Sequence, residues 1–303
     1  MNGILNIYKE KGFTSHDVVA IIRKLINQKK VGHTGTLDPD AEGVLPICLG
    51  KATKISDYIM SEKKGYRAEI TLGITTTTQD LSGEIIEINN VDFDKEKIQK
   101  AIYSFIGSYE QTPPMYSAIK INGKKLYELA REGKEIQRNA REVKIYDIKI
   151  VGFLPQNKIL IDVFCSKGTY IRTLCSDIGK KLGYGAVMSY LLRTSSGNFT
   201  IDNSIKINEL KNLVNNNAID KKIITIDEVL NNYNKIYVSS KATKLLYNGG
   251  KIYECFFYKK DNNIMKEDKV KVYDSEGIFI GIFGFYYDNI KKSNYIKPIK
   301  ILL

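Results

Sequence analysis

Residues 31–46 constrain the fold of this chain more than any other segment. Three glycines and two prolines interrupt the segment, so it must contain a tight loop rather than a continuous helix. Pro39 biases the preceding residue, Asp38, toward extended backbone geometry. A carboxylate on a glycine-flanked loop can be reactive, although most such aspartates only cap a turn. The local pattern therefore leaves both a turn role and a chemical role open for Asp38.

Two binding-loop templates can be compared with the same segment. The acidic residues from Asp38 onward and Gly43 match the start of an EF-hand calcium loop, but Leu49 stands where the final bidentate Glu belongs. A phosphate-binding loop needs Gly-Lys followed by Ser or Thr, and the sequence contains no such triplet. The four cysteines are scattered without a Cys-x-x-Cys pair, which argues against structural zinc and a disulfide framework. The sequence predicts no metal site.

The composition is typical of a globular protein whose partner is a polyanion. Of the 303 residues, 43% are hydrophobic and 26% are charged, and the chain can form a large domain plus a small one. It contains neither a span of roughly 20 apolar residues nor a signal-peptide pattern, so we expect a cytoplasmic protein without a membrane segment. The formal net charge of +12 favours nucleic acid as a partner.

The basic residues are unevenly distributed. Residues 236–303 contain twelve lysines against seven acidic residues, a denser positive charge than in the preceding part. Arginine is scarce, with seven in the chain and none after Arg193. Where lysine is the usual cation, an arginine more often reflects a need for its planar, bidentate fork.

Hydrophobic periodicity predicts a mixture of helices and strands. Helices are expected over residues 14–29, from Asp94 to Gly107, and over residues 169–182. Strands are expected over residues 67–74, 143–153 and 159–165, and a hairpin over residues 269–283. The pattern predicts an α and β region up to residue 235, followed by a second, mostly β domain over residues 236–303.

Arg172 lies in the first turn of the expected helix over residues 169–182, off its apolar stripe. A cation there opposes the positive end of the helix dipole, which costs up to about 1 kcal/mol. A carboxylate partner would remove this conflict; the alternative is an exposed arginine without a role. If the partner is Asp38, the pair would hold that carboxylate ionised, as a nucleophile or base. Tyr170, two residues before Arg172, would lie at the opening of the same site.

Three further features have a functional and an ordinary interpretation. Tyr66 adjoins basic residues, which suits stacking on a base, but such tyrosines also cover sheet edges. His33 is either a wedge or stacking group or a residue whose hydrogen bond stabilises its turn. Residues 111–125 are basic, aromatic and bounded by prolines, which is typical of a loop that closes on a polyanion or of a surface excursion.

Four blocks of this sequence resemble the TruB family of tRNA pseudouridine synthases. They are residues 32–50, 66–73, 113–127 and 165–174, and their order and spacing agree over about residues 3–200. Residues 245–250 lie in a part that resembles a PUA RNA-binding domain more weakly. The resemblance implies an α+β fold with a mixed, largely antiparallel sheet flanked by helices, plus a small β-barrel-like C-terminal domain.

The resemblance also implies an activity and site residues. The expected reaction is isomerisation of the T-loop uridine of tRNA, at tRNA position 55, to pseudouridine, without a metal or organic cofactor. Asp38 would be the catalytic carboxylate and Arg172 its ion-pair partner. Tyr66 would contact the flipped uracil, Tyr170 would line the pocket, and His33 would lie near the displaced base. Flipping the nucleotide costs a few kcal/mol. Asp38 would then attack the sugar or the ring, or abstract a sugar proton.

The chain departs from the family pattern where Glu10 replaces a proline and Leu192 replaces an arginine that is a potential phosphate contact. The resemblance implies a catalytic domain over residues 1–235, with an RNA-binding insertion at about 111–135, and an RNA-binding domain over 236–303. We expect a monomer that acts on the T-arm stem-loop without an obligatory protein partner. The alternatives are a guide-RNA-dependent subunit of a ribonucleoprotein and a tRNA folding factor whose catalysis is secondary.

Overall fold

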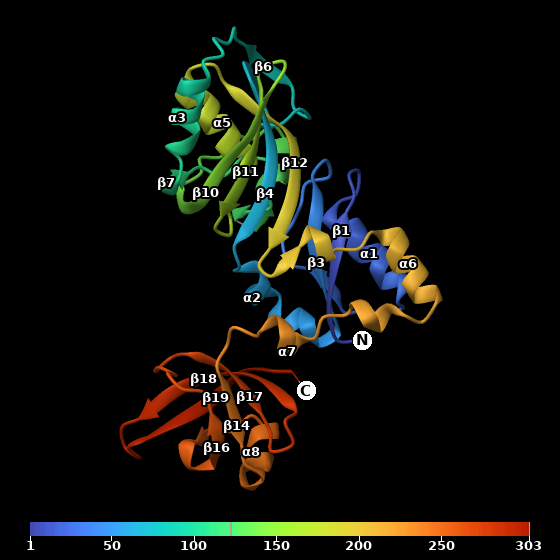
Figure 1. Ribbon diagram of the computed structural model, residues 1–303, viewed down its shortest axis with the longest axis vertical. Helices are drawn as coiled ribbons and strands as arrows, with labels where there is room; N and C mark the ends of the chain where they lie inside the picture. The colour runs from blue at the N-terminus through green and yellow to red at the C-terminus, as the bar shows by residue number, and fades with distance from the viewer. Residues whose placement is uncertain (122, 303) are drawn as a thin grey trace.

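The computed structural model describes residues 1–121 and 123–302 and contains a large sheet, with helices packed against it, and a smaller sheet (Figure 1). The strand order of the large sheet is β1-β3-β12-β4-β11-β10-β7, with β2 beside β3 and β13 beside β12. Its strands are β1 (Gly3–Lys9), β2 (Val31–His33), β3 (Glu42–Leu49), β4 (Lys64–Leu72), β7 (Gly107–Gln111), β10 (Arg141–Leu154), β11 (Lys158–Cys165), β12 (Ala186–Ser196) and β13 (Phe199–Thr200). Only the β12–β3 pair is parallel among these described strands, so the predicted mixed, largely antiparallel α+β fold is confirmed.

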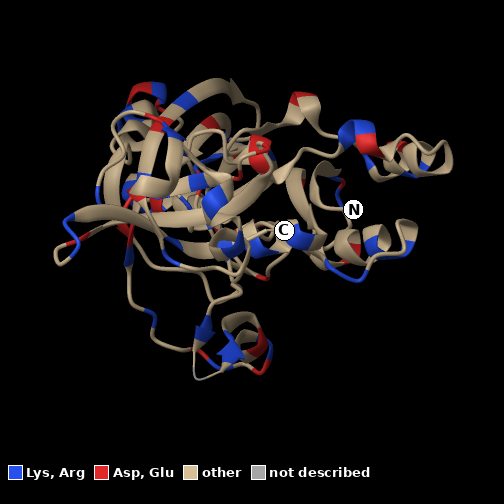
Figure 2. Cartoon of the chain, turned by 90° about the horizontal axis from the view of Figure 1, so that it is seen from below, with Lys and Arg blue, Asp and Glu red and all other residues tan. Residues whose placement is uncertain are grey.

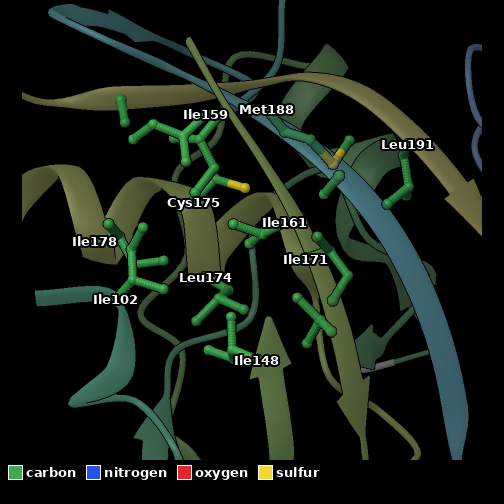
Figure 3. Packing of buried hydrophobic residues seen from close by; sticks show 14 of the residues in the cluster. Ile102, Ile148, Ile159, Ile161, Ile171, Leu174, Cys175, Ile178, Met188 and Leu191 are labelled. Atoms are coloured by element: carbon green, nitrogen blue, oxygen red, sulfur yellow. The ribbon is translucent and has the colours of Figure 1, made fainter. Parts of the chain in front are cut away.

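The helices that pack against the large sheet belong to three buried clusters. They are α1 (Ser15–Leu25), α2 (Ser56–Met60), α3 (Lys95–Tyr103), α5 (Ile171–Leu182), α6 (Ile207–Asn215) and α7 (Ile226–Val229). Figure 3 shows Leu174 and Ile178 of α5 within the cluster that Ile159 and Ile161 of β11 also form. A second cluster joins α1 and α6 to β1, β2 and β3. These two buried clusters fix α5 and α1 against the sheet, and the candidate site lies beside the starts of both helices.

Most expected elements are present, with shifted ends. Helix α1 is capped by Thr14 and ends at Leu25 rather than residue 29, because Asn27 adopts a positive φ of 48°. Asp94 caps α3 as expected. The strand expected over residues 67–74 begins earlier, at Lys64, and ends where Gly73 turns the backbone. Tyr66 therefore lies inside β4, not before it, because the pleat continues through Gly65.

The smaller sheet is curled and follows the large one in sequence. Its strands are β14 (Lys235–Val238), β15 (Ile252–Tyr253), β16 (Phe257–Lys260), β17 (Lys269–Tyr273), β18 (Phe279–Asp288) and β19 (Ser293–Ile301), with α8 (Thr243–Tyr247) between the first two. The expected hairpin is the antiparallel pair β17–β18. Ile282 and Leu302 share one buried cluster with Val44 of β3, and Lys271 forms an ion pair with Asp227 at 2.6 Å. Apolar packing therefore joins the two sheets, and the ion pair joins the smaller sheet to α7.

Two hairpins border the candidate site. They are β5 (Ile74–Thr76) with β6 (Ile85–Ile88), and β8 (Lys120–Ile121) with β9 (Lys124–Lys125), which continues into α4 (Leu126–Arg131). Figure 2 shows the lysine-bearing strands of the second hairpin projecting from the body of the molecule. Residue 122 of the expected insertion lies outside the described residues. No helix within the described ranges is long and apolar enough to cross a membrane.

We expect Gly43→Ala to destabilise the protein, because Gly43 pairs with Arg193 where β3 meets β12. Its φ is +107°, and an added Cβ would lie 2.3 Å from the carbonyl oxygen of Arg193. The loss should be about 1–3 kcal/mol in the free energy of unfolding, measured by urea denaturation. Gly32→Ala is the matched control, since a Cβ there meets open space. Equal stability of the two variants would show that the close approach of β3 to β12 does not require glycine.

Candidate active site

Four of the five predicted site residues line one cleft: Asp38, Tyr66, Tyr170 and Arg172. The cleft has a volume of about 1610 Å³, above the roughly 300–1,000 Å³ of small-molecule pockets, so it suits a macromolecular substrate. Its walls come from the loop between β2 and β3, from β4, from the β5–β6 turn and from the start of α5. The fold thus brings together residues that are up to 134 positions apart, from Asp38 to Arg172.

Arg172 and Asp38 form an ion pair, with Nε of Arg172 3.1 Å from Oδ2 of Asp38. Both Nη atoms of Arg172 are also engaged. Nη1 donates to Oδ2 of Asp80 at 3.3 Å and to the carbonyl of Thr78 at 3.2 Å, and Nη2 donates to the carbonyl of Tyr116 at 2.8 Å. The arginine side chain is only 8% exposed. Arg172 is thus a buried cation with two carboxylate partners, not an exposed residue of the first helical turn.

The two carboxylates on Arg172 have different surroundings. Oδ1 of Asp80 accepts hydrogen bonds from the hydroxyls of Thr78 and Ser82, both at 2.6 Å, and from the Ser82 amide at 3.0 Å. The Asp80 side chain is 16% exposed, whereas that of Asp38 is 41% exposed. Within the described part of the chain, the Asp38 carboxylate has no hydrogen-bonding side chain besides Arg172. Asp80 is therefore fixed, and Asp38 has free acceptor capacity toward the cleft.

The ionisation of Asp38 depends on burial and on the charges around it, which act in opposite directions. Desolvation is the largest and raises the pKa of Asp38, and the neighbouring charge of Asp80 raises it further. The guanidinium of Arg172 lowers it, but the pKa remains above its ordinary value. The sequence-based expectation that Arg172 would favour the ionised form thus describes one contribution, and burial outweighs it.

Two buried cations hold the backbone of the loop that bears Asp38. Nζ of Lys9 donates to the carbonyl of Pro39 at 3.2 Å, and Nη2 of Arg193 donates to the carbonyl of Gly35 at 3.1 Å. Burial lowers the pKa of Lys9 to about 8, while the negative charge of Asp38 opposes that shift. Sequence reasoning assigned no role to Lys9 or Arg193, because a side chain that binds carbonyl groups leaves no periodic signal.

The remaining predicted residues occupy different places. Tyr66 on β4 faces Arg193, and burial raises the pKa of its phenol. Tyr170 is the N-cap residue of α5 and is half-buried. His33 does not line the cleft; its Nδ1 accepts a hydrogen bond from the Gly35 amide at 3.3 Å, the turn-stabilising alternative. Burial lowers the pKa of His33 to about 4, so the ring is neutral at pH 7.

His16 reaches the cleft, although sequence reasoning gave it no role. It packs edge-on against His33 with ring centroids 5.2 Å apart, and it lies just inside the start of α1. Tyr116, Ser117 and Ala118 line the cleft, so the segment over residues 111–125 that was expected to close on a polyanion does border it, and Tyr127 and Arg131 of α4 line it as well. No group of three or more His, Cys, Asp or Glu side chains in residues 1–121 and 123–302 could hold a metal ion.

We expect the pKa of Asp38 to respond in opposite directions to its two charged neighbours. Arg172→Gln removes a positive charge that favours the ionised form, so the pKa should rise. Asp80→Asn removes a negative charge that disfavours it, so the pKa should fall. Titration of the Asp38 side-chain carboxyl carbon by NMR measures both shifts. Shifts of the same sign would show that Asp38 responds to repacking and not to these charges.

Comparisons with known proteins by sequence and by structure lead to the same family. A family model described as TruB family pseudouridylate synthase (N terminal domain) matches residues 23–171, and one described as tRNA pseudouridylate synthase B C-terminal domain matches residues 172–236. The tRNA pseudouridine synthase B of Alkaliphilus oremlandii is 50% identical and covers 100% of this chain and 99% of the relative. That of Clostridioides difficile is 49% identical, with 93% of this chain and 94% of the relative covered.

Solved structures extend the comparison. A chain of a Cbf5-Nop10-Gar1 complex superimposes with a TM-score of 0.77 at 27% identity, over 99% of this chain and 85% of that one. A chain of an H/ACA ribonucleoprotein bound to a substrate RNA that contains 2'-deoxyuridine gives a TM-score of 0.76 at 25% identity, with the same coverage. Since the relatives near 50% identity match over almost their whole length, the chain belongs to the TruB family of pseudouridylate synthases.

Proposed function

We propose that this protein converts the T-loop uridine of tRNA, at position 55, to pseudouridine, and that it acts alone as a cytoplasmic monomer. One observation carries the proposal: Asp38 is the carboxylate of the Arg172 network that keeps free acceptor capacity and opens to the cleft. The names of relatives about 50% identical to this chain, tRNA pseudouridine synthase B, support tRNA as the substrate.

The reaction requires a nucleophile or base and an orientated substrate, and the cleft residues can provide both. The bond between C1' of the ribose and N1 of uracil breaks, and a bond between C1' and C5 forms. C5 loses a proton and N1 gains one, so the composition of the RNA does not change. In this proposal ionised Asp38 acts on the flipped nucleotide, Arg172 holds the carboxylate in place, and Tyr66 and Tyr170 contact the base.

A guide-RNA-dependent role is the alternative that the solved structures raise. The chains with TM-scores of 0.76 and 0.77 come from ribonucleoprotein or multi-protein complexes, but they are only 25–27% identical. The relatives named for tRNA are about twice as similar and match over almost their whole length. We therefore propose direct recognition of tRNA, and an absence of turnover by the purified protein alone would favour the guided alternative.

We also propose that two basic parts of the chain bind the RNA backbone. One is the segment over residues 111–135, whose hairpin strands carry Lys120, Lys124 and Lys125 between Ala118 and Tyr127, two residues that line the cleft. The other is the PUA-like domain over residues 236–303, with its twelve lysines. Lysine contacts with phosphate groups release counterions, so their contribution falls as the salt concentration rises.

The reaction and its catalytic group can be tested together. Purified protein should release the label from a T-arm stem-loop that carries tritium at C5 of the target uridine. Asp38→Asn should lower this rate by at least roughly a thousandfold, since it removes the nucleophile or base, while the Kd for RNA changes only a few fold. Asp92→Asn, at an exposed position outside the cleft lining, is the matched control. Turnover by Asp38→Asn at a rate near that of the wild type would refute the assignment.

The role of the hairpin lysines predicts a change in affinity rather than in chemistry. Lys120→Glu should weaken binding of the stem-loop by roughly 3- to 10-fold and reduce the salt dependence of binding by about one phosphate contact. The rate at saturating RNA should be unchanged. Lys100→Glu, on the exposed face of α3 away from the cleft lining, is the charge-matched control. If both variants bind equally well, the hairpin does not contact the RNA; both quantities follow from filter binding at several salt concentrations.

A further inference from the structure

The residue before Asp38 is held by a single buried side chain. Ser15, at the start of α1, accepts a hydrogen bond from the amide of Leu37 at 2.9 Å and lies 3.2 Å from its carbonyl oxygen, to which its hydroxyl donates. Ser15 is 1% exposed, and the Leu37 side chain is buried in the cluster formed around α5. Both backbone groups of Leu37 are thus tied to a helix that is itself packed on the sheet.

The start of α5 is held in the same manner. Gln111, the last residue of β7, accepts a hydrogen bond from the amide of Tyr170 at 2.8 Å through Oε1 and donates to its carbonyl at 3.0 Å through Nε2. Gln111 is 1% exposed and pairs through its backbone with Arg141 of β10. Tyr170 provides no side-chain cap to α5, and Arg172 follows two residues later. The sheet therefore fixes the helical turn from which the guanidinium extends.

We infer that Ser15 and Gln111 are positioning residues, which hold the backbones on either side of the Asp38–Arg172 ion pair so that the carboxylate meets the target nucleotide at a fixed place. This inference rests on the proposed function for its effect on turnover. Ser15 in α1 binds the amide and the carbonyl of Leu37, the residue next to Asp38. Gln111 in β7 binds the amide and the carbonyl of Tyr170, two residues before Arg172. A displacement of about 1 Å at a reacting group can lower a rate by roughly a hundredfold.

Two substitutions that remove these bonds test the inference. Ser15→Ala removes one hydroxyl, and Gln111→Met keeps the length of the side chain without its amide. Each should lower kcat for label release roughly 10- to 100-fold, whereas the Kd for the stem-loop should stay within about threefold. A purely structural role would lower the melting temperature without this separation of kcat from Kd.

The matched controls lose bonds of the same kind elsewhere. Ser204→Ala removes a hydroxyl that donates to the carbonyl of Ile201 at 2.6 Å. Gln28→Met removes an amide that binds both the amino group and the carbonyl of Met1, at 3.0 and 2.9 Å. Both controls should retain the wild-type kcat. An unchanged kcat in Ser15→Ala and Gln111→Met, or an equal loss in the controls, would overturn the inference.

A second readout does not depend on turnover. A looser ion pair weakens the influence of Arg172, so the pKa of Asp38, followed by NMR, should rise in Ser15→Ala and in Gln111→Met but not in the controls. If the wild type releases no label, the proposed function fails while this titration still tests the positioning. An Asp38 pKa that is the same in all five proteins would overturn the positioning role by itself.

Discussion

The guanidinium of Arg172 is the interaction on which the arrangement of the cleft depends. It contacts the loop that bears Asp38, the turn that bears Asp80 and the carbonyl of Tyr116, and these three segments have no strand pairing with one another. A buried cation without partners costs several kcal/mol, so Arg172 requires these acceptors. The acceptors are in turn held by Arg172. The packed position of α5 therefore determines the position of each segment. The site is built outward from one helix turn.

The same arginine explains how two carboxylates can lie on one cation without equivalent roles. Asp80 accepts hydrogen bonds from donors of its own turn, and its side chain is mostly covered. Asp38 pairs with the arginine alone, so its oxygens remain available toward the cleft. Pairs of acidic groups in unequal environments commonly divide structural and chemical work in this manner. Here the inequality arises from Thr78 and Ser82, which surround one carboxylate only.

Those parts of the structure that produce local or periodic signals could be predicted from the sequence. The helical stripe of α5 and the alternation of β4 both reflect burial on one face, and they were predicted with small errors at the ends. A carboxylate partner for Arg172 was also predicted, because a cation at a helix N-terminus requires compensation, and the family resemblance named Asp38 as that partner. Ser15 and Gln111 could not be found, since a hydrogen bond to a distant backbone amide imposes no spacing on the sequence. His16 gives no signal either, because its position in the cleft depends on how α1 packs.

The surroundings of the cleft suggest a division between affinity and chemistry. Lys9, Arg193 and Ser15 bind backbone groups of the loop that bears Asp38, and Gln111 binds those of Tyr170, so the two members of the ion pair are placed before any substrate arrives. The β8–β9 hairpin, by contrast, bears lysines and projects from the body (Figure 2). Phosphate attraction tolerates imprecise geometry, because it acts over a Debye length of about 8–10 Å. Bond rearrangement tolerates far less, because the reacting atoms must approach to about 3–3.5 Å. In the function proposed above, a fold that keeps these demands on separate elements lets the hairpin bind RNA without disturbing the Asp38–Arg172 ion pair.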